Sequence, residues 1–364
     1  MISFQPTEDQ TLVAETIRRF VNERVVKVRH EADESRQLPE NLVQEGWSLG
    51  LLAGWIPEES GGLGEPHSMV SAALYAEELG AGDLSLALHL LTPALAGLPI
   101  NLFGTPAQKE RWLPALAAGD FPGLTAAWGE THWDFDPLTP RTLAILQGDN
   151  YVLNGNKALV PLAENADLIL VYATHEGQPQ IFLVEKNAPG LNISPREHNM
   201  GLNALATYEI HLENCTVPRS ARLGGEQGAD VNKLLAYSRV GLGALAVGLA
   251  RSAHSYALNY AKERQAFGRA IAQFQSIAFM LAEMAWEIDA ARLLVLEAAW
   301  NLDQGNDALA QSALAKLYAD EMVLTVADRS VQILGGHGYI REHPVEGYLR
   351  NARAFAVING LGLI

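Results

Sequence analysis

The chain has 364 residues, of which 48% are hydrophobic and 19% charged, as expected for a globular enzyme with enough length for two or three domains. Its formal net charge of −16 argues against nucleic acid and anionic membranes as partners, because both repel an acidic protein. The single cysteine, Cys215, excludes an internal disulfide. The opening residues MISFQPTEDQ show neither the basic nor the apolar region of a secretory signal. We therefore expect a cytoplasmic protein with a large core.

The first third of the chain is predicted to be helical. Residues 6–29 place apolar side chains at helical spacing, with Thr7 as the candidate N-cap, and a second helix is expected over 39–50. Residues 84–103 contain no charged residue and are long enough to cross a bilayer. They also contain two prolines, a histidine and an asparagine, and no basic residues flank them asymmetrically. We therefore predict a buried helix there, and no membrane span, within a helical domain formed by residues 1–121.

Residues 122–225 change to short β-prone runs separated by turn residues, which predict a small β-barrel or sandwich. Turns are expected at Gln147-Gly148-Asp149-Asn150 and at Asn154-Gly155. The predicted strands are Thr142–Leu146, Tyr151–Leu153, Leu168–Ala173, Gln180–Val184, Leu191–Ser194 and Thr207–Leu212. Residues 226–364 return to helix, with long segments over 229–263, 273–304 and 306–334. The predicted fold is therefore α+β, in the order α, β, α.

Two motifs in the last third contain residues suited to binding a diphosphate. Residues 331–364 read VQILGGHGYIREHPVEGYLRNARAFAVINGLGLI, in which a helical pattern ends at Gly335-Gly336 and a further helix follows Pro344. Glycines adopt positive φ and allow a backbone or a diphosphate to approach closely. Upstream, residues 263–268 read ERQAFG, and Arg264 could bind two phosphate oxygens at once through its planar guanidinium.

The C-terminal string Q-x-x-G-G-x-G-Y-x-x-x-x-P-V-E-x-x-x-R-x-A-R closely resembles the signature of the acyl-CoA dehydrogenase family. These flavoproteins remove two hydrogens from Cα and Cβ of an acyl thioester. The E-R-x-x-F-G…F-Q element, the P-E-E-x-G-G-x-G turn at 57–64 and the segment G-T-P-A-Q-K-E-R-W-L-P at 104–114 resemble the same family in matching order. The resemblance implies the acyl-CoA dehydrogenase fold: a helical N-terminal domain, a central β-barrel domain and a C-terminal four-helix bundle that oligomerises.

The resemblance implies FAD as the cofactor and acyl-CoA as the substrate, and it allows an electron-transfer flavoprotein as a further partner. In relatives, the ADP portion of FAD is held across a subunit interface. The matching residues here are Arg264, Phe267, Gln275, Gln332, Gly335 and Gly336. The simpler alternative is a solvated arginine at a helix end and an ordinary glycine stop. The occurrence of both motifs in one chain favours the flavin interpretation.

The residues that should surround the flavin ring and the substrate differ from the family pattern. The family's T-E-P-x-A-G-S-D loop and K-x-W-I-T-N strand correspond to residues 127–134 and 157–162, where only the lysine matches clearly. The catalytic base, the first Glu of Y-E-G-T-x-E, corresponds to Asn359. A second family position for the base corresponds to Ser238, beside Arg239, a candidate substrate contact. Neither residue is the carboxylate that proton removal from Cα requires.

This pattern resembles the base-lacking subunit of a heteromeric α2β2 acyl-CoA dehydrogenase. In that hypothesis a paralogous subunit supplies the catalytic Glu, and this chain binds the ADP end of that subunit's FAD. One alternative is a self-sufficient flavoenzyme with a substitute base, for which Glu130 and Asp134 (with His132 between them) are candidates, or an oxygen-using relative. Another is a structural subunit without flavin.

Two further patterns have simpler explanations. Gly241-Leu-Gly243-Ala-Leu-Ala246 resembles a dinucleotide fingerprint, but no strand precedes it and the run is helical, so close helix packing explains it better. The ten histidines show no metal-ligand spacing, and we predict no metal site.

Overall fold

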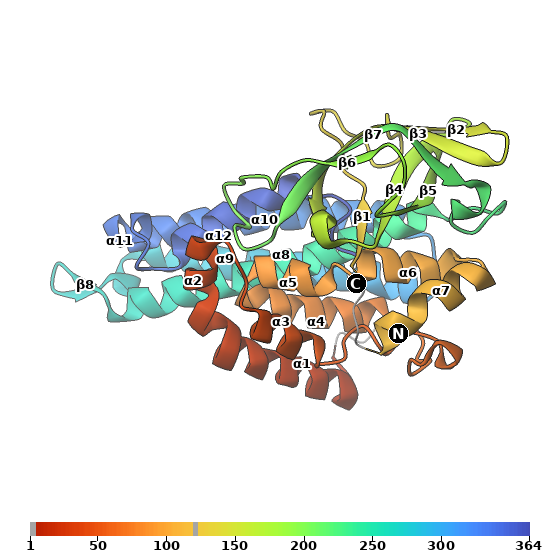
Figure 1. Ribbon diagram of the computed structural model, residues 1–364. Coiled ribbons are helices and arrows are strands. Elements are labelled where there is room, and N and C mark those ends of the chain that lie inside the picture. Colours follow the sequence, from red (N-terminus) through yellow and green to blue (C-terminus); the bar gives the residue numbers. More distant parts are fainter. Residues whose placement is uncertain (1–4, 119–122) are drawn as a thin grey trace.

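The computed structural model describes residues 5–118 and 123–364, which form a long helical layer with a β-sheet domain above one end (Figure 1). The expected boundary at 121–122 lies outside the described residues. The N-terminal region consists of α1 (Glu8–Phe20), a π-helical turn (Val21–Val25), α2 (Val26–Ser35), α3 (Glu40–Trp47), α4 (Met69–Gly82), α5 (Leu84–Leu91), α6 (Ala94–Phe103) and α7 (Pro106–Ala117). The helical N-terminal region that the sequence predicts is confirmed.

The first predicted helix begins where expected and ends later. Thr7 is the N-cap, with its side chain accepting from the Gln10 N–H and the Gln10 side chain returning the bond in a capping box. The helical path continues through the π-helical turn into α2 and ends at Arg36, which adopts a left-handed conformation at φ 57°. The predicted end at residue 29 is therefore wrong, because the terminating residue is not a glycine and gives no sequence signal.

Residues 84–103 form two buried helices, α5 and α6, where one was predicted. Pro93 lies between them and has no N–H to continue the backbone ladder. This segment and α8 (Val231–Glu263) are both long and apolar enough to cross a membrane by length and composition alone. The apolar windows of the two segments are 78% and 89% buried inside the protein, which is typical of core helices in a globular domain.

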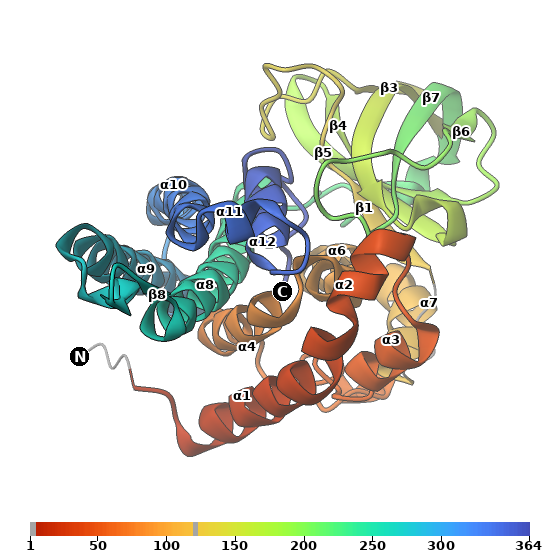
Figure 2. The ribbon, with the colours of Figure 1, turned by 90° about the vertical axis from the view of Figure 1, so that its left-hand side faces the viewer.

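The central domain is a curled seven-stranded sheet in the order β1-β4-β2-β3-β7-β6, with β5 paired to β4 (Figure 2). Its strands are β1 (Leu124–Ala127), β2 (Leu143–Gln147), β3 (Asn150–Pro161), β4 (Leu168–His175), β5 (Gln178–Glu185), β6 (Leu191–Ile193) and β7 (Thr207–Pro218). The six predicted strands are confirmed, β1 was missed, and the turn predicted at Asn154-Gly155 is wrong. There β3 continues with a shift in register against β7, and Gly155 allows the close approach of Thr142.

The C-terminal region consists of α8, the β8–β9 hairpin (Gln265–Ala266 and Arg269–Ala270), α9 (Gln275–Asp303), α10 (Leu309–Leu334), α11 (Gly336–Tyr339) and α12 (Val345–Ala352). Viewed along their axes, α8, α9 and α10 pack against one another, and α4 packs against α8 and α9 (Figure 2). The small residues of α8 serve this packing: a Cβ on Gly243 would lie 2.8 Å from the Val295 side chain, and one on Gly248 would lie 2.1 Å from the Glu77 carbonyl oxygen. The packing explanation for the glycine pattern is thus the one that fits.

Candidate functional site

The residues expected to hold the ADP portion of FAD gather at one end of the helical layer. Arg264 is the C-cap of α8, and Phe267 lies at the tip of the β8–β9 hairpin that follows. The hydroxyl of Tyr260, one turn before Arg264, lies 2.6 Å from Nδ1 of His337 in α11. This hydrogen bond links the helix end that carries Arg264 to the glycine motif, which ends α10 at Gly335 with φ 57°.

These residues are presented to the outside of the chain. Arg264, Phe267, Gln275, Gln332, Gly335 and Gly336 are all exposed. The Phe267 side chain is 96% exposed, on a backbone with φ 51° that a non-glycine residue rarely adopts. A Cβ added at Gly335 or Gly336 would meet nothing within 4 Å. A large exposed aromatic ring next to backbone that no other group covers is typical of a surface that binds another molecule.

The segment that contains Asn359 runs along the helix that contains Ser238. Within residues 358–364, the Gly362 N–H lies 3.4 Å from Oγ of Ser238 in α8. Ser238 is 1% exposed and Asn359 is partly buried. The two base positions of the family pattern thus lie on segments that pack against each other, and neither residue is an acid.

Trp128, in the loop expected to line the flavin ring, packs against the segment that contains Asn359. Trp128 is 1% exposed, stacks on Tyr172 with ring centroids 3.9 Å apart, and donates its indole N–H to the Pro137 carbonyl at 3.1 Å. Gly360, at φ 89°, lies against the same indole, so close that an added Cβ would be 2.8 Å from Cβ of Trp128. Sequence reasoning missed this contact, whose only signal was an aromatic residue in the expected ring loop.

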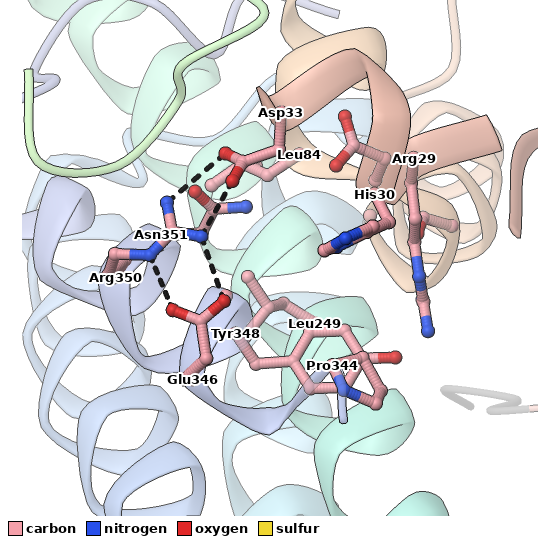
Figure 3. Close-up of a pocket in the computed structure, with 14 residues that line it drawn as sticks. Arg29, His30, Asp33, Leu84, Leu249, Pro344, Glu346, Tyr348, Arg350 and Asn351 are labelled. Carbon is pink, nitrogen blue, oxygen red and sulfur yellow. Dashed lines mark hydrogen bonds and ion pairs between the residues drawn. The ribbon is translucent and has the colours of Figure 1, made fainter. Parts of the chain in front are cut away.

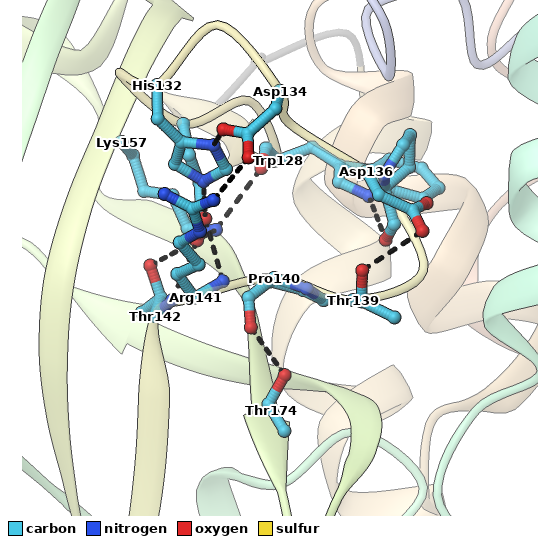
Figure 4. A network of polar contacts seen from close by, with 12 residues as sticks. Trp128, His132, Asp134, Asp136, Thr139, Pro140, Arg141, Thr142, Lys157 and Thr174 are labelled. Carbon is cyan, nitrogen blue, oxygen red and sulfur yellow. Dashed lines mark hydrogen bonds and ion pairs between the residues drawn. The ribbon is translucent and has the colours of Figure 1, made fainter.

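Glu130 is 8% exposed and lies in a buried polar network and not in an open site. Figure 4 shows its partners Lys157, His132 and Thr142 close together. Oε1 of Glu130 lies 2.9 Å from Nζ of Lys157 and accepts from the Thr142 N–H and hydroxyl, while Oε2 accepts from the Arg141 N–H and lies 2.8 Å from His132 Nε2. Burial alone would raise the pKa of this carboxyl, but the Lys157 charge and the hydrogen bonds outweigh it and lower the pKa to about 2. A carboxylate with so low a pKa and every lone pair engaged is a poor general base.

The other members of the network are held in the same way. Asp134 pairs with the Arg141 guanidinium at 2.5 Å and with His132 Nδ1 at 3.0 Å. Burial raises the pKa of Asp134, and the hydrogen bond from His132 and the charge of Arg141 lower it below its ordinary value overall. Lys157 is fully buried, which lowers the pKa of its ammonium to about 8, so it stays protonated at neutral pH. The one family match in the ring region thus serves an internal ion pair.

The strand expected to line the flavin ring departs from regular geometry. Between Lys157 and Val160 its pairing with β7 shifts register, and Leu159 lies in the left-handed region at φ 56°. The carbonyl of Pro161 accepts from the Thr125 hydroxyl at 2.7 Å. The side chains of Leu159 and Pro161 carry no hydrogen-bonding group. Together with the buried Trp128, this part of the chain does not fit an isoalloxazine ring.

Arg239 lies one residue beyond Ser238 in α8 and is partly buried. It donates to the Leu309 carbonyl at 3.4 Å, and burial lowers the pKa of its guanidinium while the charge of Asp136 opposes the shift. A half-buried cation beside the base positions could contact an anionic part of a substrate, so Arg239 stays a candidate.

Five well-formed pockets among the described residues are not lined by Trp128. A cavity of 60 Å³ between α2 and α12 contains Arg350, which pairs with Asp33 and Glu346, each at 2.7 Å (Figure 3). It is far too small for a dinucleotide. The Arg350–Asp33 ion pair fastens α12 to α2, whereas the Arg350–Glu346 pair lies within α12. Within the two described stretches of the chain, no group of three or more His, Cys, Asp or Glu side chains could hold a metal ion.

The two halves of the expected flavin site lie far apart on this chain. Ser238 and Arg264 are separated by 26 residues of α8, which corresponds to about 39 Å at 1.5 Å per residue. Figure 1 places the β domain and the β8–β9 hairpin at opposite ends of the helical layer. The residues around Arg264 and the segments expected to hold the flavin ring are therefore far apart on this chain.

Comparison with known proteins identifies the class that this arrangement belongs to. Models of the N-terminal, middle and C-terminal domains of acyl-CoA dehydrogenases match residues 7–120, 125–215 and 227–362. Benzylmalonyl-CoA dehydrogenase of Aromatoleum aromaticum is 36% identical over 99% of this chain and 96% of its own length. The caffeyl-CoA reductase-Etf complex subunit CarC of Acetobacterium woodii is 33% identical over 97% and 95% of the respective chains.

Solved structures give the same result. Butyryl-CoA dehydrogenase from Megasphaera elsdenii superimposes with a TM-score of 0.89 at 31% identity, covering 99% of this chain and 96% of its own. PigA with FAD and proline gives 0.88 at 27% identity over 99% and 96%. The chain belongs to the acyl-CoA dehydrogenase family, whose members are FAD-dependent oxidoreductases that act on CH–CH bonds.

Proposed function

We propose that this chain is the base-lacking subunit of a heteromeric acyl-CoA dehydrogenase and completes the FAD site of a paralogous partner. The proposal rests on a difference between two parts of the expected FAD site: the residues for the ADP portion, and the residues for the flavin ring and the catalytic base. The residues suited to the ADP portion of FAD are intact and exposed, whereas both base positions lack an acid and Trp128 is buried where the ring is expected. A chain with only the ADP-binding residues can bind part of a neighbouring subunit's FAD, but it cannot remove the Cα proton itself.

Each exposed residue has a physical role in this arrangement. Arg264 would hold two diphosphate oxygens with its guanidinium, and Gln275 and Gln332 would donate side-chain N–H groups. Phe267 would cover an apolar face of the cofactor, and the backbone at Gly335 and Gly336 would approach the diphosphate without a Cβ in the way. FAD, when bound, supplies the two-electron acceptor for the hydrogen that leaves Cβ. The partner supplies the carboxylate that accepts the Cα proton.

Other assignments have less support. A self-sufficient enzyme would need a substitute base, and the Lys157 ion pair makes Glu130 a weak one. A structural subunit without flavin would explain the missing acid but not the six retained residues suited to ADP. An oxygen-using relative needs no base but would hold a flavin ring of its own, and the buried Trp128 in the expected ring loop speaks against that. The similarity to a subunit of a reductase-Etf complex supports an electron-transferring flavoprotein as the electron-transfer partner. A cytoplasmic location remains part of the proposal.

The test is to purify this chain alone and together with the paralogous subunit, and to measure flavin absorption and acyl-CoA oxidation. We expect flavin and turnover only in the mixed complex, with Arg264→Ala weakening FAD binding about 10- to 100-fold, because a charge-assisted contact contributes about 1.5–3 kcal/mol. Arg111→Ala is the matched control, since Arg111 is an exposed arginine in α7, remote from the hairpin. Full flavin content and dehydrogenation by the isolated chain would overturn the proposal.

A further inference from the structure

Residues 358–364 form an apolar segment that is buried although it contains no regular helix or strand. Ile358, Leu361, Leu363 and Ile364 are 2%, 5%, 0% and 5% exposed. Burial at this level is typical of core side chains, which are stabilised by removal of their apolar surface from water. The segment is therefore held in place by the hydrophobic effect and is not a loose tail.

The segment is anchored to all three parts of the protein. Gly360 lies against Trp128 of the β domain. Gly362 lies against α8, where its carbonyl oxygen would be 1.9 Å from a Cβ added at Gly241. The carbonyl of Ile364 lies 2.7 Å from Nε2 of His67, in the turn that precedes α4. Two glycines in the segment and one in α8 permit these approaches, which no residue with a side chain would allow.

The same space is where a flavin ring and an acyl thioester would have to meet. The family pattern places the ring at residues 127–134 and the base at Asn359, and here these two segments are in van der Waals contact through Trp128 and Gly360. The tryptophan is held by its stack on Tyr172 and by the hydrogen bond to Pro137. A ring inserted between Trp128 and Gly360 would have to displace either the indole or the segment.

We infer that residues 358–364 are a built-in plug that closes this chain's own flavin-ring and acyl site. Any FAD bound by the assembly then has its ring in the partner's site, which gives one FAD for each pair of unlike chains. This deepens the proposed function and rests on it for the identity of the second chain, whereas the closure itself follows from the contacts within this one.

Hydrogen exchange measured by mass spectrometry on the full-length chain tests the plug. We expect the amides of residues 358–364 to exchange at least tenfold more slowly than those of an unstructured peptide, and to be unaffected by added FAD. Leu363→Asp should abolish this protection by placing a charge at a fully buried position, while the amides of α8 stay protected. Val357→Asp is the matched control, because Val357 adjoins the segment but is 60% exposed.

Three results would overturn the plug: rapid exchange of residues 358–364 in the unmodified chain, release of the segment on addition of FAD, or unchanged protection in Leu363→Asp. If Leu363→Asp unfolds the whole chain, the exchange rates of residues 358–364 in the unmodified protein, measured without and with FAD, still test the plug. These outcomes are independent of Arg264→Ala in the mixed complex, so failure of the plug and failure of the proposed function can be told apart.

Discussion

Nζ of Lys157 lies 2.9 Å from Oε1 of Glu130, and both side chains are almost completely removed from solvent. Replacing one member of a buried ion pair leaves the other charge without compensation. We expect Glu130→Gln to lower the free energy of unfolding by about 3–5 kcal/mol, measured by urea denaturation. Asp134→Asn, in the same loop but partly exposed, should change stability little. If Glu130→Gln left the free energy of unfolding unchanged but abolished activity, that result would instead favour a catalytic role for Glu130.

The same pair predicts a pH dependence of stability. The folded-state pKa of Glu130 is lowered from 4.5 to about 2, so the unfolded chain binds the proton more readily. The stabilisation from this group is fully present above pH 4.5 and is lost as the pH falls towards 2. The stability difference between the unmodified protein and Glu130→Gln should therefore shrink over that range in chemical denaturation series. A difference that is constant with pH would contradict the ionic description of the pair.

Two glycines on helices of the C-terminal region should respond in opposite ways to alanine. A Cβ at Gly241 would lie 1.9 Å from the Gly362 carbonyl oxygen, so Gly241→Ala should destabilise the protein by about 1–3 kcal/mol. A Cβ at Gly336 would meet nothing within 4 Å, so Gly336→Ala should leave stability unchanged or raise it by up to about 1 kcal/mol. The second change should nevertheless weaken FAD binding by the mixed complex, measured by flavin fluorescence. Equal effects on stability would be inconsistent with the packing at Gly241.

Phe267 should matter for the cofactor and not for the fold. Because its ring is 96% exposed, Phe267→Ala should change the free energy of unfolding by less than about 0.5 kcal/mol, while FAD dissociates more readily from the mixed complex. Phe355→Ala, at a fully buried phenylalanine, should cost about 3–5 kcal/mol and serves as the contrast. Unaltered FAD affinity in Phe267→Ala would remove Phe267 from the cofactor site.

Restoring the acid alone should not restore the enzyme. We expect Asn359→Glu in the isolated chain to raise dye-linked acyl-CoA oxidation by less than about tenfold, although a working general base contributes about 10²–10⁴-fold. The reason is that Trp128 and Gly360 remain in contact where the flavin ring would lie. Asn359→Gln is the control of equal size without an acid. Activity comparable to that of ordinary relatives after this one change would show that the ring site is open.

The hydroxyl of Tyr172 is buried and makes no hydrogen bond to the described residues. An unpaired buried polar group costs about 1–3 kcal/mol, and removing it leaves the stack on Trp128 in place. Tyr172→Phe should therefore unfold at the same or a higher urea concentration than the unmodified protein. Tyr151→Phe in β3 is a comparison within the same sheet. A clear loss of stability in Tyr172→Phe would indicate that a water or another group pairs with this hydroxyl.

Much of the fold, and the motifs of the candidate ADP-binding residues, could be read from the sequence, because those features depend on local order. Helical and strand periodicity, the Thr7 cap and the glycine stop at Gly335 are each set by neighbouring residues. The motif around Arg264 carries its chemistry in consecutive letters. The absence of an acid at positions 359 and 238 could also be read from the sequence, because the identity of a residue does not depend on the three-dimensional structure.

What only the tertiary structure decided depends on residues far apart in the chain. Glu130 was a candidate base by its place in the loop, and its contact with Lys157 makes it a structural anion instead. The contact of Trp128 with Gly360, more than two hundred residues away, arises from the docking of the β domain on the helices. Burial and ion pairing depend on the whole surroundings of a side chain, so no local pattern could reveal the contact between Trp128 and Gly360 or the ion pair of Glu130.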